Sequence, residues 1–189
     1  VVEMVLSGNV NKSIVNAINS QGGKGVGLSG KDANMIECEQ DNPKLGFVGK
    51  IKKVDTDIVQ NFIKSDFIPV IAPIGFGIKG ETFNINGDTA AGAIASSLLA
   101  DRLLLLTDVV GVKDSEGQLI NQLTIEEAKN LIDSGIINSG MIPKVNTSIK
   151  AIEEGVRASV IIDGRVDHAC LLELFTSHGV GTLFKKTFD

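Results

Sequence analysis

The chain has 189 residues, of which 43% are apolar and 22% charged, proportions that exclude a disordered chain. Its net charge of −5 and its lack of Trp and Tyr argue against nucleic-acid binding. The absence of a long apolar run, together with two widely separated cysteines, Cys38 and Cys170, predicts a reduced cytoplasmic protein that does not enter a membrane.

The hydrophobic pattern alternates helices with strands. An amphipathic helix is predicted over residues 2–18 and ends at Gly22-Gly23. Because no capping residue precedes this helix, we expect the sequence to be the C-terminal part of something longer. Continuous apolar runs at 67–74, 103–106 and 160–162 predict buried parallel strands. The other predicted elements are strands at 25–29, 35–39, 46–54, 82–85 and 182–185, and helices at 56–64, 88–100, 124–135, 141–154 and 166–176.

This alternation predicts an α/β fold, a three-layer sandwich whose mainly parallel sheet is covered by helices on both faces. Thr124 and Glu127 form a capping box at the start of one of the helices. Pro143 near the start of another suits a first turn, where its missing N–H costs nothing.

Two glycine motifs look like nucleotide loops. The segment 25–32 fits the first seven positions of a P-loop, but Asp32 replaces the Ser or Thr that should hold magnesium, and a strand follows. A turn between strands is favoured there. The segment 75–80 matches G-x-G-x-x-G after a strand, yet no helix begins until residue 88. The alternative function of a nicotinamide-dependent oxidoreductase is supported by that loop alone.

Two other segments place polar groups where α/β sheets bind ligands, at the ends of predicted strands. Asn84, Asn86 and Asp88 lie between a strand and an Ala-rich helix; the alternative is that Asp88 only complements the helix N-terminus. The turn at 106–112 follows a buried strand, and it is either a nucleotide contact or an ordinary strand exit.

The segment 139–144 carries Lys144 in the first turn of a predicted helix, where a cation opposes the helix dipole. A bound polyphosphate would explain this placement, because backbone N–H groups and the ammonium would face the same anion. The alternative is a solvated lysine on an exposed face.

Taken together, the segments resemble the acetylglutamate kinases of the amino acid kinase family over essentially all 189 residues. The resemblance implies a carbamate kinase-like fold, N-terminally truncated here, with residues 1–99 as the remainder of an acetylglutamate-binding lobe and 100–189 as a nucleotide-binding lobe. It implies transfer of the ATP γ-phosphoryl to the side-chain carboxylate of N-acetyl-L-glutamate, a step of arginine biosynthesis. Mg²⁺ would arrive with the ATP, and no protein metal site is expected. The matching segments are 27–32, 69–74, 84–92, 105–111, 140–144, 161–165 and 173–176.

The resemblance also implies residue roles. Lys144 would stabilise the transferred charge, Asp88 would orient the catalytic lysines, and Asn84 and Asn86 would contact the acetylglutamate. The residues that would line the nucleotide are Asp108, Val109, Val110, Gly111, Val112, Ile136, Ile137, Asn138, Gly140 and Met141.

A regulatory site and a dimer are implied as well. Glu173 and the backbone near Gly179 would bind L-arginine as a feedback inhibitor, although Val160 replaces a His that is frequent in that branch; otherwise Glu173 is an exposed helix residue. The helix at 2–18 would join two copies.

Two departures limit the resemblance. The lysine- and glycine-rich strand with which family members begin, and their substrate-binding arginine, are not among these residues. We therefore expect the 189 residues alone to be inactive or nearly so. The alternative function is a catalytically silent module of this family that binds arginine or nucleotide.

Overall fold

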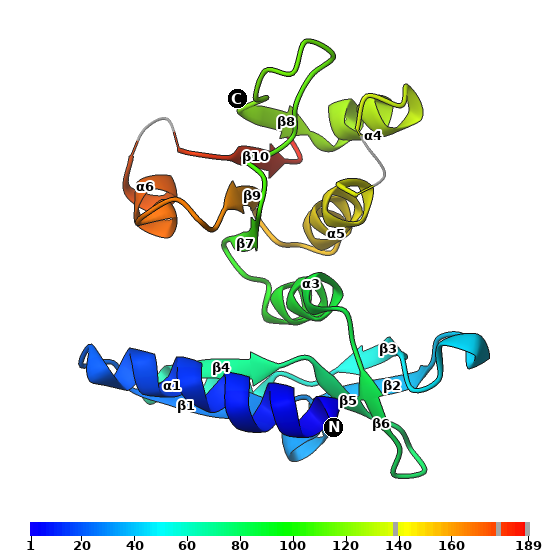
Figure 1. Cartoon of the computed structure of the whole chain (residues 1–189), viewed down its shortest axis with the longest axis vertical. Coiled ribbons are helices and arrows are strands. Elements are labelled where there is room, and N and C mark those ends of the chain that lie inside the picture. The colour runs from blue at the N-terminus through cyan, green and yellow to red at the C-terminus, as the bar shows by residue number, and fades with distance from the viewer. Residues whose placement is uncertain (138–139, 177–178, 188–189) are drawn as a thin grey trace. The chain divides into compact units, whose positions relative to one another are not determined.

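A computed structural model of the chain describes residues 1–137, 140–176 and 179–187. The chain divides into two compact units, Val1–Leu98 and Leu99–Asp189, which we call unit 1 and unit 2 (Figure 1).

Unit 1 begins with a long helix, wound first as a π-helix, η1 (Met4–Val10), and then as α1 (Asn11–Ser20). Gly22, with a φ of 85°, follows its end, as the sequence predicts. The remaining elements are β1 (Gly25–Ser29), η2 (Asp32–Asn34), β2 (Ile36–Gln40), η3 (Pro43–Leu45), β3 (Gly49–Val54), α2 (Asp57–Lys64), β4 (Ile68–Ala72), β5 (Ile74–Phe76), β6 (Thr82–Asn84) and α3 (Gly87–Leu98).

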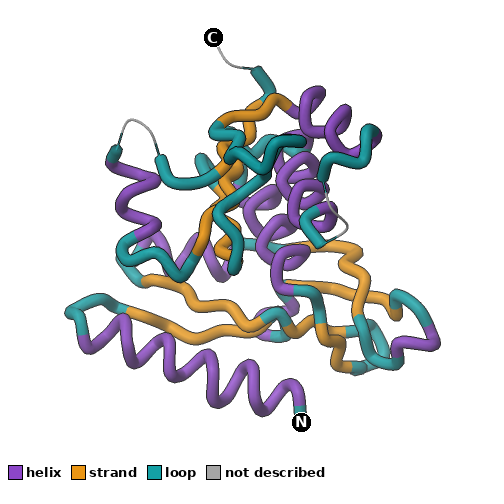
Figure 2. The backbone as a smooth tube through the Cα atoms, turned by 45° about the horizontal axis from the view of Figure 1, so that its top comes forward, coloured by secondary structure: helices purple, strands orange, loops and turns teal. Residues whose placement is uncertain are grey.

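The first helix runs along the parallel pair β1–β4 (Figure 2). Asn11 is its buried residue, and its Nδ2 donates to the carbonyls of Leu28, at 3.2 Å, and Val70, at 2.8 Å. One side chain therefore ties the helix to both strands. The predicted apolar stripe is largely turned to solvent: Val2, Val10 and Ile14 are each 41–47% exposed.

The prediction of one buried strand over 67–74 is wrong. That run forms β4, which pairs with β1, and β5, which lies between β2 and β6 in the sheet β3-β2-β5-β6. Pro73 separates the two strands because it has no N–H to continue a ladder, and its carbonyl accepts a hydrogen bond from Ile85 N at 2.9 Å. The start of the run is also not buried, since Ile68 is 47% exposed.

The glycines of the P-loop-like segment serve packing. A side chain at Gly27 would overlap Asn11, and one at Gly30 would overlap the Ile74 carbonyl. Lys31 Nζ contacts Glu3 Oε1 at 2.8 Å and Thr82 Oγ1 at 2.9 Å. The turn between strands predicted for this segment is confirmed, with η2 connecting β1 to β2. The segment after Gly75 likewise turns back into β6 without a helix.

Unit 2 contains one mixed sheet in the order β7-β9-β10-β8, with β7 and β9 parallel, β8 and β10 parallel, and β9 and β10 antiparallel. Its elements are β7 (Leu103–Thr107), β8 (Gln122–Thr124), α4 (Ile125–Asp133), α5 (Ile142–Glu153), β9 (Ser159–Asp163), α6 (Ala169–Phe175) and β10 (Thr182–Lys185). The strand β8 was not predicted from the sequence.

The central strand β9 shows why unit 2 has three layers. Val160 and Ile162, on one face, pack with Ala169 of α6. On the other face the Ser159 hydroxyl donates to the Ser148 hydroxyl of α5 at 2.9 Å. Because successive side chains of a strand point to opposite faces, β9 is buried between two helices, which Figure 1 shows on either side of it. The predicted α/β sandwich is confirmed.

Local signals set several boundaries of unit 2. The capping box is present: Glu127 N donates to Thr124 Oγ1 at 3.2 Å, and Thr124 N donates to Glu127 Oε2 at 2.8 Å. The hydrogen bonds that Thr124 N and Thr124 Oγ1 donate to the Glu127 carboxylate lower the pKa of Glu127. The helix α6 begins at residue 169, later than predicted, because His168 adopts a left-handed φ of 60°.

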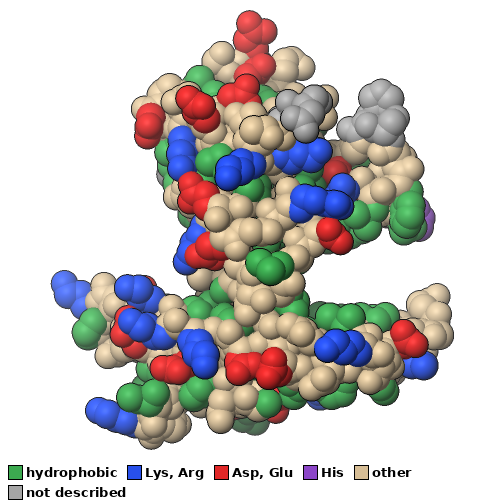
Figure 3. All heavy atoms as spheres, turned by 180° about the vertical axis from the view of Figure 1, so that it is seen from behind, with side chains coloured by type: hydrophobic (Ala, Val, Ile, Leu, Met, Phe, Trp, Pro, Cys, Tyr) green, Lys and Arg blue, Asp and Glu red, His purple; other side chains and the backbone are tan. Residues whose placement is uncertain are grey.

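Charged side chains of both signs are interspersed on the surface of each unit visible in Figure 3. Several form exposed pairs, among them Arg157 with Asp101 at 3.4 Å and Lys129 with Glu153 at 2.7 Å. Among the described residues, no helix is both long enough and apolar enough to cross a bilayer.

Candidate functional site

A cavity of about 490 Å³ opens in unit 2, where two parallel strands end. β7 and β9 are neighbours, so their carboxyl ends meet at the same sheet edge, the usual position of ligands in α/β folds. Gly164 N donates to Thr107 O at 2.8 Å and joins the two strand exits. The lining residues are Thr107, Asp108, Val109, Val110, Gly111, Val112, Lys113, Asp114, Ile136, Ile137, Gly140, Met141, Lys144 and Arg165.

The described residues that the sequence assigned to the nucleotide all line this cavity. They come from three separate segments: the exit of β7, the end of α4 and the entry to α5. Lys144, the predicted catalytic lysine, lines the same cavity and is half-buried. Asn138 lies outside the described residues.

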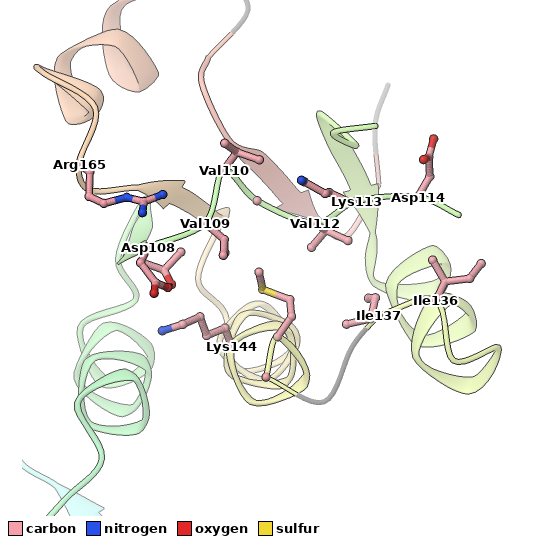
Figure 4. A pocket seen from close by; sticks show the side chains of 14 residues that line it. Asp108, Val109, Val110, Val112, Lys113, Asp114, Ile136, Ile137, Lys144 and Arg165 are labelled. Atoms are coloured by element: carbon pink, nitrogen blue, oxygen red, sulfur yellow. The ribbon is translucent and has the colours of Figure 1, made fainter. Parts of the chain in front are cut away.

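The cavity has a charged end and an apolar end (Figure 4). Lys144 and Arg165 extend toward Asp108 at the charged end. The other end is lined mainly by isoleucine and valine side chains, including Val112 and Ile137, which are 1% and 4% exposed. Lys113 and Asp114 also lie there. A ligand with an anionic part and a flat apolar part fits such a division, and the volume lies within the roughly 300–1,000 Å³ of small-molecule sites.

The position of Lys144 follows from the start of α5. The helix begins at Ile142 with Pro143 in its first turn, and Lys144 N donates to Met141 O at 3.0 Å. The N-terminal end of α5, which is the positive end of its helix dipole, therefore lies beside the lysine. Both features favour an anion at this end of the cavity.

A buried threonine fixes the loop that forms one wall. Thr182 of β10 is fully buried, and its Oγ1 donates to Ile120 O at 2.7 Å and accepts from Val112 N at 2.9 Å. Gly111, with a φ of 142°, passes so close that a side chain there would overlap Thr182 Oγ1. No local pattern in the sequence identifies Thr182, because its contact with Val112 joins residues 70 positions apart.

Arg165 and three other lining residues, Thr107, Lys113 and Asp114, were also not assigned from the sequence. Arg165 makes a two-pronged contact with Asp163: Nε to Oδ1 at 2.9 Å and Nη2 to Oδ2 at 2.7 Å. The hydrogen bonds from the Arg165 side chain and backbone lower the pKa of Asp163 to about 2. The hydrogen bond and charge of Asp163, and more weakly the charge of Asp108, raise the pKa of Arg165.

The predicted substrate and orienting residues lie in unit 1. Asn84 lines a second cavity of about 460 Å³ together with Phe47 and Thr82. Asn86 Oδ1 accepts from Thr89 N at 3.1 Å, so Asn86 caps α3. Asp88 is in the first turn of that helix. Because Asp88 and Lys144 belong to different units, the predicted contact between them stays a prediction.

The two residues predicted to bind an effector are close to each other in unit 2. Glu173 is 7% exposed, and its Oε2 accepts from Val180 N at 2.9 Å. A side chain at Gly179, which has a φ of 60°, would approach this carboxylate to 2.5 Å. Glu173 is therefore not an exposed helix residue.

Comparison with known proteins decides the family. The family described as "Amino acid kinase family" matches residues 1–163. The chain belongs to the amino acid kinase family.

The similar sequences within this family are acetylglutamate kinases. The chain is 60% identical over 186 residues to the acetylglutamate kinase of Ruegeria sp. (strain TM1040) and 56% identical over 188 residues to that of Paracoccus denitrificans. The alignments cover 98% and 99% of this chain, but it spans only 65% and 62% of those two proteins.

Solved structures agree with the fold of an amino acid kinase. N-acetylglutamate synthase from Neisseria gonorrhoeae, complexed with coenzyme A and N-acetyl-glutamate, is similar with a TM-score of 0.86 and 28% identity, over 96% of this chain and 42% of that one. The same enzyme complexed with coenzyme A and L-arginine gives a TM-score of 0.78 at 30% identity, over 87% and 38%. Carbamate kinase from Giardia shares the fold, with a TM-score of 0.71 at 17% identity, over 98% and 71%.

In the described part of this amino acid kinase chain, no group of three or more His, Cys, Asp or Glu side chains is arranged to hold a metal ion. Asp108 lines the cavity at the end where Lys144 and Arg165 lie (Figure 4). Mg²⁺ typically takes one or two protein carboxylates together with phosphate oxygens, and Asp108 is a carboxylate of this kind.

Proposed function

We propose that the cavity of unit 2 binds ATP and ADP, with the phosphates at the Lys144 end and the base at the apolar end. The observation that carries this is the convergence on one cavity of the exit of β7 and the connection from α4 to α5, with a cation at one end and mainly apolar walls at the other. Mg²⁺, bound to the phosphates, would neutralise part of their charge.

We further propose that the protein phosphorylates the side-chain carboxylate of N-acetyl-L-glutamate, in arginine biosynthesis. The 60% identity to an acetylglutamate kinase supports this substrate. The nucleophile needs no general base, because a glutamate side chain with a pKa near 4.3 is already ionised at neutral pH. Catalysis then depends on aligning two anions and on stabilising the transferred charge.

The residue roles follow from this chemistry. Lys144 would stabilise the charge on the transferred phosphoryl group, and Asp88 would orient the lysine. Asn84 and Asn86 would hold the acetylglutamate, Asn84 from the unit 1 cavity that it lines. L-Arginine would act as a feedback inhibitor at Glu173 and Gly179, which are adjacent in the fold.

We also propose that two copies associate through the helix of residues 2–18. Its exposed apolar side chains support this: Val2, Met4, Val5, Val10 and Ile14 are between 41% and 76% exposed. A cytoplasmic location remains a prediction that rests on the two widely separated cysteines.

The nucleotide proposal is tested by calorimetric titration of the chain with Mg-ADP. Lys144→Ala should weaken binding roughly tenfold or more through loss of a charge-assisted contact to phosphate. Lys150→Ala is the matched control, because Lys150 is on the same helix but exposed and paired with Glu154 at 3.7 Å. Absence of ADP binding to the folded chain, or equal effects of both variants, would contradict the proposal.

The catalytic proposal needs a longer protein. We expect the 189 residues alone to release no ADP in response to acetylglutamate. In a chimera, the 189 residues of this chain would replace the matching 65% of the Ruegeria acetylglutamate kinase. Acetylglutamate-dependent ADP release by the chimera supports the kinase. A chimera that is folded and binds ADP without turnover supports the alternative, a silent binding module.

A further inference from the structure

Arg165 lines the nucleotide cavity without an assigned role. It lies two residues beyond the end of β9, at the strand edge where the cavity opens. Its side chain is 68% exposed and therefore buries little apolar surface. The strand exit is already fixed by the hydrogen bond from Gly164 N to Thr107 O. Its structural contact is with Asp163, and this contact uses Nε and Nη2 of the guanidinium.

Asp163 holds the guanidinium in one orientation. Three contacts converge on its carboxylate: from Arg165 backbone N at 3.0 Å, Nε at 2.9 Å and Nη2 at 2.7 Å. The Asp163 side chain is itself 9% exposed. Such a side-on contact occupies one edge of the planar guanidinium, so the end carrying Nη1 is turned away from Asp163.

The outward end of the guanidinium faces the charged end of the cavity. Figure 4 shows Arg165 above Asp108 and Lys144 below it. The charge of Asp108 raises the pKa of Arg165, which agrees with the closeness of these two side chains. Lys144 and the outward end of Arg165 are cationic donors on either side of Asp108, while Asp163 pairs with the other edge of the guanidinium. The proposed phosphates would lie between these two donors.

We infer that Arg165 is a phosphate-binding residue of this cavity, which contacts the nucleotide phosphates through the outward end of its guanidinium while Asp163 holds it in place. This inference rests on the proposed nucleotide site. A planar guanidinium presents paired donors that match two phosphate oxygens, whereas a lysine is a point charge. Arg165 would therefore distinguish nucleotides by their phosphates and be indifferent to the base.

The test compares Mg-ADP with adenosine, titrated calorimetrically into the chain and its variants. Arg165→Gln should weaken ADP binding roughly tenfold or more, through loss of a charge-assisted contact, and leave adenosine affinity unchanged. The ADP affinity of Arg165→Lys should lie between those of the unaltered chain and Arg165→Gln, because lysine keeps the charge but lacks the planar pair of donors. Arg157→Gln is the matched control: Arg157 is exposed, belongs to unit 2 and also pairs with an aspartate.

Each other outcome decides against the inference. ADP affinity unchanged in Arg165→Gln overturns the role of Arg165 and leaves the nucleotide site standing. Equal losses for ADP and adenosine, with Arg165→Lys restoring neither, show that Arg165 only maintains the cavity shape. Failure of the unaltered chain to bind ADP overturns the proposed function and this inference together.

Discussion

Two lysines of this chain follow glycine-containing segments that could bind phosphate, and they lie in different settings. Lys31, in unit 1, contacts Glu3 and Thr82, and nearby glycines make room for Asn11 and for the Ile74 carbonyl. Lys144, in unit 2, lines a cavity at the start of a twelve-residue helix. The comparison teaches that a glycine–lysine pattern does not by itself place the lysine at a cavity; Lys144 has a cavity and a helix N-terminus beside it, and for that reason we propose the phosphate site there.

The largest expected effect separates these two lysines directly. In the chimera, Lys144→Ala should lower kcat roughly 100-fold or more, since it removes charge stabilisation from the transferred phosphoryl group. Lys31→Ala should leave kcat near its starting value, because its salt bridge is partly exposed and of small energy. Steady-state assays of ADP release measure both. A comparable fall in kcat for Lys31→Ala would break the distinction.

Glycine substitution should show that the P-loop-like segment is structural. Gly30→Ala should lower the free energy of unfolding by about 1–3 kcal/mol, because the added methyl meets the Ile74 carbonyl and the Ile36 side chain. Urea denaturation measures the loss. Gly46→Ala provides a contrast, since Gly46 has open space but a positive φ of 65° and is affected only through the backbone. Weakened ADP binding by folded Gly30→Ala would instead argue for a phosphate role.

Thr182→Val should reduce both stability and nucleotide affinity. It preserves the shape of the side chain but leaves Val112 N and Ile120 O without their partner, at a cost of about 1–3 kcal/mol. Thr182→Ser keeps the hydroxyl and should restore ADP affinity, measured by calorimetry. If Thr182→Val binds ADP as tightly as the original chain, the loop does not depend on this contact.

Loss of the cap on α4 should be a smaller effect, confined to stability. Thr124→Ala removes the acceptor for Glu127 N and should cost about 1 kcal/mol in urea denaturation. ADP affinity should not change, because neither residue lines the cavity. A change in affinity would show that α4 is coupled to the nucleotide site.

The smallest expected effect is the dependence of stability on pH that comes from Asp163. Asp163 has a pKa of about 2 in the folded chain, whereas the usual pKa of Asp is near 3.9. In the folded chain it therefore stays ionised at pH values between these two. Its contribution to stability is therefore complete above about pH 4 and declines as the pH falls toward 2. The stability difference between the chain and Asp163→Asn, measured by urea denaturation, should shrink over that interval. A difference that does not vary with pH would contradict the lowered pKa.

The sequence predicted several local features of the fold well, because their signals lie within a few residues. The capping box at Thr124 was visible in the sequence, and the bounds of β1 and β10 were predicted as observed. The split at Pro73 was missed because a continuous apolar run does not reveal that its two halves pair with different strands. Asn86 was predicted to contact the substrate. In the structure it caps α3, because Thr89 N donates a hydrogen bond to its side chain.

By itself, the sequence determined the α/β alternation, because periodicity and caps are encoded in short segments. It also carried the family resemblance, which implied most of the residues that line the unit 2 cavity. The tertiary structure alone decided that Lys31 is engaged by Glu3 and Thr82, that Thr182 fixes the loop at Val112 and that Asp163 orients Arg165 into the cavity. The physical reason is that a side chain's role depends on which distant atoms satisfy its hydrogen bonds and charge, and the packing of strands and helices selects those partners.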